Sequence, residues 1–155
     1  MSRFVTQVPL RWTDQDAYRH VNHARVVTLL EEARVELAFT AAGSEGLAGF
    51  STGLLVAGLE VTYKRQIAYR PEPLRVTMDV RDVRAASFTL GYEMHDGPES
   101  SDPVAVTAVT RMALYDLTAN RPRRLRADER EFLGRWADDG AADTAADTSA
   151  VGSTR

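Results

Sequence analysis

A short polar stretch near the N-terminus holds most of the side chains that could do chemistry. It contains Asp14, Asp16, His20, Asn22 and His23, so two of the three histidines of the chain fall within it. A carboxylate near a histidine can accept and donate protons and can activate a water molecule. The chain has no cysteine, which excludes a thiol nucleophile, a disulfide framework and a thiolate metal site. With three histidines and no tight ligand spacing, the sequence predicts no metal site.

The composition predicts one packed domain, since the chain has 155 residues, of which 44% are hydrophobic and 26% charged. The net charge of −3 argues against a nucleic-acid-binding protein, which normally carries a basic face. The sequence shows no signal peptide and no apolar run of membrane-spanning length, so we expect a cytoplasmic protein without a membrane partner. Glycine-rich phosphate loops are also absent, and no cofactor is expected.

The polar stretch runs into a segment with helical periodicity. Asn22 is a good N-cap, because its side-chain oxygen can accept a hydrogen bond from an unpaired N–H group of the first turn. Glu31 and Arg34 lie three positions apart at the border of the apolar stripe and can pair. Gly43 is predicted to end the helix. The apolar stripe consists of Val26, Leu29, Leu30, Ala33 and Leu37.

Alternation of apolar and polar residues predicts five strands. Pro9 indicates an edge position or a bulge for the first strand rather than a central position, because proline cannot donate a ladder hydrogen bond. A short helix is expected over residues 127–136. The tail 137–155 is almost entirely Ala, Asp, Thr, Gly and Ser, and it is predicted to be disordered. The strands are expected at residues 4–12, 54–68, 74–83, 86–95 and 104–117.

This order of elements predicts an α+β fold for residues 1–136. The strongly apolar helix needs a wide surface to cover it, so one antiparallel sheet must curl around it. A single sheet leaves a face or an edge uncovered, and we therefore expect at least a dimer.

Two stretches carry a family resemblance. The first is Arg11-Trp12-x-Asp14-x-Asp16-x-x-x-His20-Val21-Asn22-His23, followed by Leu30-Glu31-Glu32-Ala33-Arg34. The second joins Glu60-Val61-x-Tyr63 to Tyr69-Arg70-Pro71-Glu72-Pro73-Leu74. Together they resemble the hotdog-fold acyl-CoA thioesterases of the 4-hydroxybenzoyl-CoA thioesterase type. The resemblance extends from about Phe4 to Leu125 in the order and spacing of elements, and the N-terminal run is its most specific part.

The resemblance implies a hotdog fold, in which a five-stranded antiparallel sheet wraps around one long helix. It also implies a homodimer or a dimer of dimers, with an acyl-CoA substrate at the interface between subunits. The catalytic carboxylate of the family matches Asp16, and a histidine that assists in some members matches His23. Plant acyl-carrier-protein thioesterases carry an Asp-x-Asn-x-His-Val-Asn pattern, which points to His20 and Asn22 instead. In this chain, Tyr18 stands where that pattern has asparagine. Val26 stands where many relatives carry a tyrosine.

The chemistry of thioester hydrolysis suits these residues. Negative charge develops on the carbonyl oxygen, and a helix N-terminus near His23 and Ala24 offers N–H groups and a positive dipole end. Asp16 can act on water as a general base or attack the carbonyl as a nucleophile. Asn22 and His23 are expected to position water or substrate. The candidate substrate-binding residues are His20, Ala24, Glu31, Lys64, Arg65 and Arg70.

Each candidate also has a structural interpretation. Asp16 could cap a turn, Asn22 could serve only as an N-cap, and Glu31 could be no more than the partner of Arg34. Asp14 is interpreted as a residue that holds the loop through backbone N–H groups. His95, late in a strand, is interpreted as a surface histidine.

The sequence therefore predicts an acyl-CoA thioester hydrolase. The alternative is a hotdog protein that binds acyl thioesters without cleaving them. A hydratase or dehydratase on the same fold is a third hypothesis, against which the Asp14-x-Asp16 run speaks.

Overall fold

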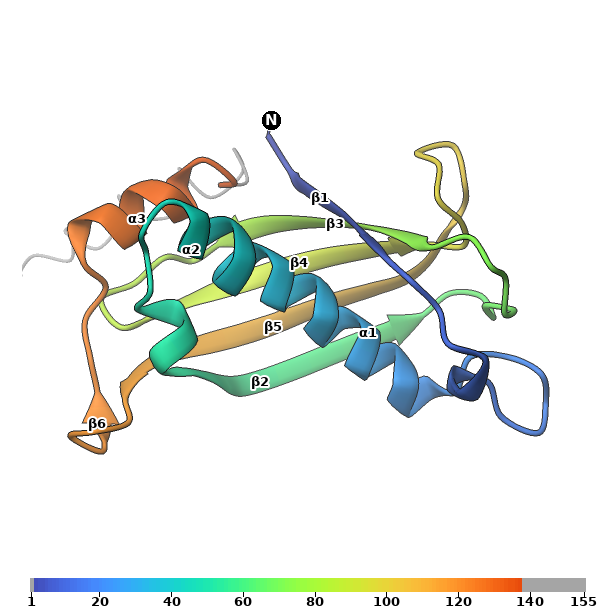
Figure 1. The fold of residues 1–155 in the computed structure, drawn as a ribbon, viewed down its shortest axis with the longest axis horizontal. Helices are drawn as coiled ribbons and strands as arrows, with labels where there is room; N and C mark the ends of the chain where they lie inside the picture. The colour runs from blue at the N-terminus through green and yellow to red at the C-terminus, as the bar shows by residue number, and fades with distance from the viewer. Residues whose placement is uncertain (1, 138–155) are drawn as a thin grey trace, which may run out of the picture.

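The computed structural model describes residues 2–137, which form one curved sheet and one long helix (Figure 1). The predicted tail lies outside the described residues from position 138 onward. The strands are β1 (Phe4–Val8), β2 (Leu54–Tyr63), β3 (Leu74–Arg81), β4 (Ser87–His95), β5 (Val104–Asp116) and the short β6 (Arg121–Pro122). The α-helices are α1 (His23–Val35), α2 (Ala42–Ser44) and α3 (Ala127–Gly134).

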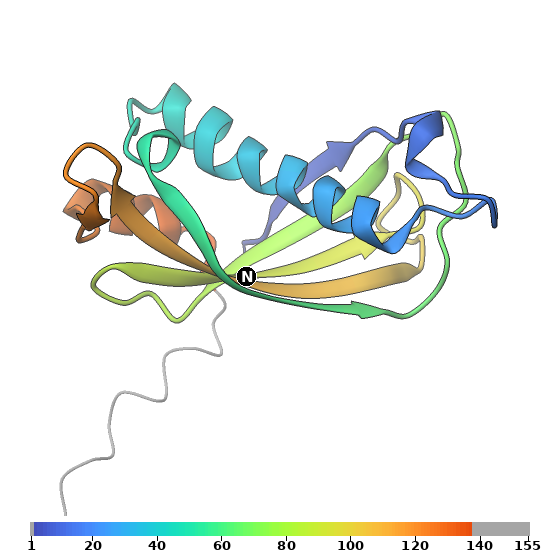
Figure 2. The same cartoon turned by 90° about the horizontal axis from the view of Figure 1, so that it is seen from below.

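The sheet is antiparallel throughout, in the order β1-β3-β4-β5-β2, and β6 pairs with β5. Helix α1 lies lengthwise over the concave face of this sheet, which curves beneath it (Figure 2). The predicted hotdog fold is thereby confirmed. The edge position predicted for the first strand is also confirmed, since β1 pairs only with β3, although the strand ends at Val8, before Pro9.

Helix α1 buries its apolar stripe in the core that it shares with the sheet. Four stripe residues of α1 itself are buried, as is Leu37 beyond it. Opposite them, the inner face of the sheet contributes buried Met78, Leu90 and Met112. Burial of apolar surface, at about 25 cal/mol per Å², stabilises this contact.

The predicted stop at Gly43 is wrong. The chain continues from α1 through a π-helical segment, Glu36–Ala41, into α2, and a left-handed backbone follows the helical region at Gly46 (φ 80°). The strand expected over residues 54–68 also ends early, at Tyr63. None of the described helices is long and apolar enough to cross a membrane.

The interpretation of His95 as a surface residue is wrong as well. Its side chain is buried, and its Nδ1 atom lies 2.8 Å from the carbonyl oxygen of Asp102. The hairpin between β4 and β5 folds back over the ring, and a register shift at the end of β4 places His95 opposite Val104. The alternation of residues along a strand does not predict that His95 is buried, because its burial depends on how the hairpin closes.

A buried ion pair fastens α3 to the segment that follows β6. The Glu129 side chain is 0% exposed, and its two oxygens each lie 2.8 Å from a guanidinium nitrogen of Arg123. Burial raises the pKa of this carboxyl, but hydrogen bonds from Arg123 and from the backbone N–H of Arg126 outweigh it and hold the pKa below the usual 4.5. Gly49 is required here, because a Cβ atom at that position would lie 2.1 Å from a Glu129 oxygen.

Candidate active site

The loop before α1 is fastened at Asp14. Its carboxylate is 1% exposed and accepts the Arg11 backbone N–H at 2.7 Å and an Arg11 guanidinium nitrogen at 2.9 Å. This hydrogen bond raises the pKa of the Arg11 guanidinium. Asp14 also accepts the Asn22 backbone N–H at its own carbonyl oxygen, at 2.9 Å. Asp14 thus shapes the loop, as the sequence indicated.

A tight reversal then brings the second aspartate back towards the helix. The Asp16 N–H donates to the carbonyl of His20 at 3.0 Å, and the Arg19 N–H donates to the carbonyl of Asp16 at 3.0 Å. Arg19 takes a left-handed backbone conformation (φ 63°), which closes the turn. The reversal places Asp16 beside Asn22, six positions later in the sequence.

Asn22 joins the Asp16 carboxylate to the helix. Its Nδ2 group donates to Asp16 Oδ2 at 3.2 Å, while its Oδ1 atom accepts the Ala24 N–H at 2.9 Å and so caps α1. The other Asp16 oxygen accepts the Tyr18 backbone N–H at 2.9 Å. Within residues 2–137, no hydrogen-bond partner is found for the backbone N–H groups of His23 and Arg25, which leaves two donors at the helix start.

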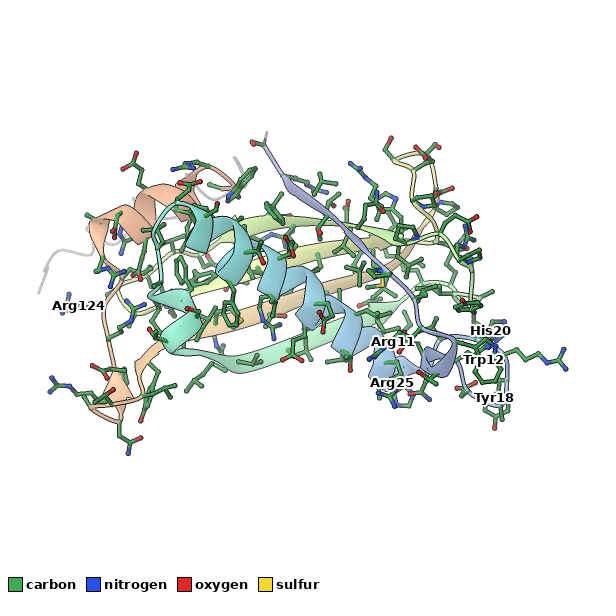
Figure 3. The ribbon with its side chains drawn as sticks, viewed as in Figure 1. Arg11, Trp12, Tyr18, His20, Arg25 and Arg124 are labelled. Carbon is green, nitrogen blue, oxygen red and sulfur yellow. The ribbon has the colours of Figure 1, made fainter. Side chains whose placement is uncertain are left out.

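A cavity of about 530 Å³ opens beside this carboxylate. It lies at the end of the molecule where Figure 3 shows Tyr18 and His20 beyond the start of α1. The cavity is half-open, with an apolar side formed by Val26, Ile67 and Val106. Its lining residues are Asp16, Tyr18, His20, Val21, His23, Val26, Tyr63, Lys64, Arg65, Gln66, Ile67 and Val106.

The structure brings five of the predicted site residues into this lining and leaves four outside it. Asp16, His20, His23, Lys64 and Arg65 line the cavity. Asn22 and Ala24 lie next to it in sequence and are joined to each other by the cap. The other two candidates, Glu31 and Arg70, form ion pairs of 3.4 Å with Arg34 and with Asp96, respectively.

Tyr63 is a lining residue that the site prediction missed. It is the last residue of β2, and its hydroxyl donates to the carbonyl oxygen of His23 at 2.9 Å. Its ring also meets the His23 imidazole edge-on, with 6.5 Å between centroids. The residue belongs to the family-like stretch Glu60-Val61-x-Tyr63, but nothing in the sequence indicates a contact across forty positions.

Among residues 2–137, no group of three or more His, Asp or Glu side chains could hold a metal ion. The site combines a carboxylate, two imidazoles, a helix N-terminus and two exposed cations. Such a set can activate water and stabilise an oxyanion.

Several proteins similar to this chain are named as thioesterases. Over 128 residues, the chain is 26% identical to the long-chain acyl-CoA thioesterase FadM of Escherichia coli K12, covering 83% of this chain and 95% of that protein. A predicted thioesterase from Bacillus stearothermophilus superposes with a TM-score of 0.72 at 19% identity, covering 88% and 97% of the two chains. A Thermus thermophilus thioesterase solved with coenzyme A and Zn gives 0.66 at 22% identity, covering 83% and 90%.

The family model of the thioesterase-like superfamily matches residues 10–136, which span the whole site and all elements except β1. The chain belongs to the thioesterase-like superfamily, and it is a thioester hydrolase.

Proposed function

We propose that the protein hydrolyses acyl-CoA thioesters with Asp16 as its catalytic carboxylate. The observation that carries this proposal is the link from Asp16 Oδ2 through Asn22 to the first turn of α1. Asp16 and His23, the first residue of α1, both line the cavity, which supports a site that pairs a carboxylate with the start of the helix. The FadM relative, named for long-chain acyl-CoA, supports the substrate class.

The reaction needs two groups with different tasks. Asp16 takes a proton from a water molecule whose oxygen attacks the thioester carbon, or Asp16 itself attacks and forms an anhydride that water then cleaves. The carbonyl oxygen becomes an oxyanion and accepts hydrogen bonds at the start of α1, where the dipole end is positive. Collapse of the tetrahedral intermediate breaks the C–S bond, and the CoA thiolate leaves and takes up a proton.

His23 and His20 have supporting roles in this proposal. His23 is the first residue of α1 and lines the cavity, where its imidazole can form hydrogen bonds with water or substrate. His20 also lines the cavity, and its imidazole is proposed to contact the substrate there.

The experiment is turnover of a panel of acyl-CoAs, detected with a thiol-reactive dye. Because the protein has no cysteine, the dye reports only the released CoA thiol. Release of CoA from at least one member of the panel is the expected result. If acyl-CoAs raise the melting temperature of the protein and none is cleaved, the binding-only alternative holds.

The exposed cations at the cavity mouth are proposed to hold the phosphates of coenzyme A. The backbone N–H groups of Lys64 and Arg65 both donate to the Ala105 carbonyl, which fixes this segment against β5 while the side chains remain exposed. Replacing both by alanine is expected to raise KM for acyl-CoA about tenfold, since each exposed charge contributes weakly. Steady-state kinetics at two salt concentrations measure the effect, which should shrink as salt screens the charges.

The control for this double variant is Arg124→Ala, which removes an exposed arginine at the opposite end of the molecule (Figure 3). It should leave KM unchanged. An unchanged KM in the Lys64/Arg65 variant, or an equal rise in the Arg124 variant, would contradict a local phosphate site.

We also propose that the protein is a homodimer, alone or paired into a tetramer, that joins through β2. This strand pairs with β5 along one edge only, and its apolar Leu55, Val56 and Leu59 are each more than 40% exposed. An unpaired edge with exposed apolar side chains is a template for another strand, and a second copy satisfies both the edge and the side chains.

Leu59→Glu is therefore expected to convert the dimer to a monomer, because it places a charge in the proposed interface. Sedimentation velocity measures the mass. Leu117→Glu is the matched control, since Leu117 is 61% exposed just beyond β5 and outside the proposed edge. A monomeric wild type, or a Leu59→Glu variant that keeps the wild-type mass, rejects this interface.

A further inference from the structure

Tyr63 reaches from the sheet to the start of α1. Its hydroxyl donates to the His23 carbonyl oxygen at 2.9 Å, and within residues 2–137 it is the only side chain of a strand that bonds to the backbone of the first helical turn. The edge-on contact between the Tyr63 and His23 rings, with 82° between their planes, is a second contact between the strand and the helix. The strand β2 and the helix α1 are thereby joined at the wall of the cavity.

This bond is one end of a continuous chain of hydrogen bonds. The His23 carbonyl belongs to the same peptide unit as the Ala24 N–H, which donates to Asn22 Oδ1 at 2.9 Å. The Asn22 amide in turn donates through Nδ2 to Asp16 Oδ2 at 3.2 Å. Four groups are thus linked in series: a phenol, a peptide, an amide and a carboxylate. Groups bonded in series polarise and orient one another.

We propose that Tyr63 is a positioning residue that holds the helix start, and through it Asn22 and Asp16, in the geometry for catalysis. The inference rests on the proposed catalytic role of Asp16. His23, Ala24 and Arg25 are all exposed, so Val26 is the one residue of the first turn that is buried in the core. Helix ends fray where contacts are few, and the Tyr63 hydroxyl supplies a contact from the rigid sheet.

The test is Tyr63→Phe, which keeps the ring contact with His23 and removes only the hydroxyl. We expect kcat on the best acyl-CoA to fall about five- to tenfold, the factor that corresponds to one net hydrogen bond, with KM changed less than twofold. Tyr63→Leu also removes the ring and should lower kcat further. Tyr115→Phe is the matched control, because its hydroxyl donates to Asn120 Oδ1 in the β5–β6 hairpin at 3.0 Å, and it should match the wild type.

A second measurement does not depend on turnover. Amide hydrogen exchange by NMR should show faster exchange at Ala24 in Tyr63→Phe than in the wild type, with core strands unchanged. Wild-type values of both kcat and Ala24 exchange in Tyr63→Phe overturn the inference. So does a rise in KM at constant kcat, which marks Tyr63 as a substrate contact instead. If the wild type cleaves no acyl-CoA, the proposed function fails and the catalytic role of Tyr63 fails with it, while the Ala24 exchange still shows whether Tyr63 holds the helix start.

Discussion

Asp16→Asn is expected to lower kcat for acyl-CoA hydrolysis by about a thousandfold while the protein stays folded and still binds its substrate. General-base catalysis contributes typically 10²- to 10⁴-fold, and an amide can neither take a proton from water nor form an anhydride. Asparagine has nearly the shape of aspartate and can still accept the Tyr18 N–H at its side-chain oxygen. The measurement is kcat and KM with the thiol-reactive dye, alongside the melting temperature.

The structural interpretation of Asp16 is tested by a matched variant. Asp116 also accepts the backbone N–H two residues later, that of Thr118, at 2.9 Å, and it lies at the end of β5 in another turn. Asp116→Asn should keep wild-type kcat. If Asp16→Asn keeps wild-type kcat as well, Asp16 only caps its turn. Trapping with hydroxylamine during turnover separates the two chemical routes, because only a covalent anhydride leaves a hydroxamate on Asp16.

Glu129→Gln is expected to destabilise the fold by about 3 kcal/mol, because it leaves the Arg123 guanidinium without its carboxylate in a site where Glu129 is fully buried. For a protein of this size, that corresponds to a fall in melting temperature of roughly 6–12 °C. Glu45→Gln is the control. Glu45 also pairs with an arginine, Arg135, at 2.7 Å, but both side chains are at least 40% exposed, so little change is expected.

The same carboxyl predicts how stability depends on pH. The pKa of Glu129 is lowered in the folded state, so its contribution is complete above the unfolded value of about 4.5 and is lost as the pH falls through the lower folded value. Wild-type stability should therefore drop as the pH falls below about 4.5, and Glu129→Gln should lose less over that interval. Urea titrations from pH 3 to pH 7 measure both curves. If the stabilities of the two proteins fall in parallel as the pH is lowered, the loss of stability in acid does not come from Glu129.

The fold was largely predictable because its main elements follow simple periods. The stripe from Val26 to Leu37 predicted the helix, and alternation in residues 74–95 predicted β3 and β4 to within two residues at each end. The π-helical segment could not be predicted, since Glu36–Ala41 contains ordinary helix formers and the irregularity depends on packing. The helix stop failed because Gly43 is tolerated within a helix, at a modest cost.

The candidate site was predictable where it is local and not where it is assembled. Asn22 as the N-cap follows from residue type alone, and the structure shows that bond. Its second bond, to Asp16, depends on the chain reversal that Arg19 closes in a left-handed conformation. An arginine in the sequence does not indicate that conformation. Tyr63 meets His23 only because β2 ends beside the helix start, a matter of topology.

The cap of α1 has a consequence for which residue types position 22 can accept. Ser, Thr, Asp and Asn are ordinarily near-equivalent as N-caps, because each offers an oxygen to the first turn. Here the side chain must offer an oxygen to Ala24 and an N–H to Asp16 at once. Aspartate has no donor and would place two negative charges together, and a hydroxyl group is too short to span both partners. Asparagine is the one residue among these caps whose side chain has both a carbonyl oxygen and an NH₂ group. At this helix start it therefore connects the backbone of the first turn to a carboxylate.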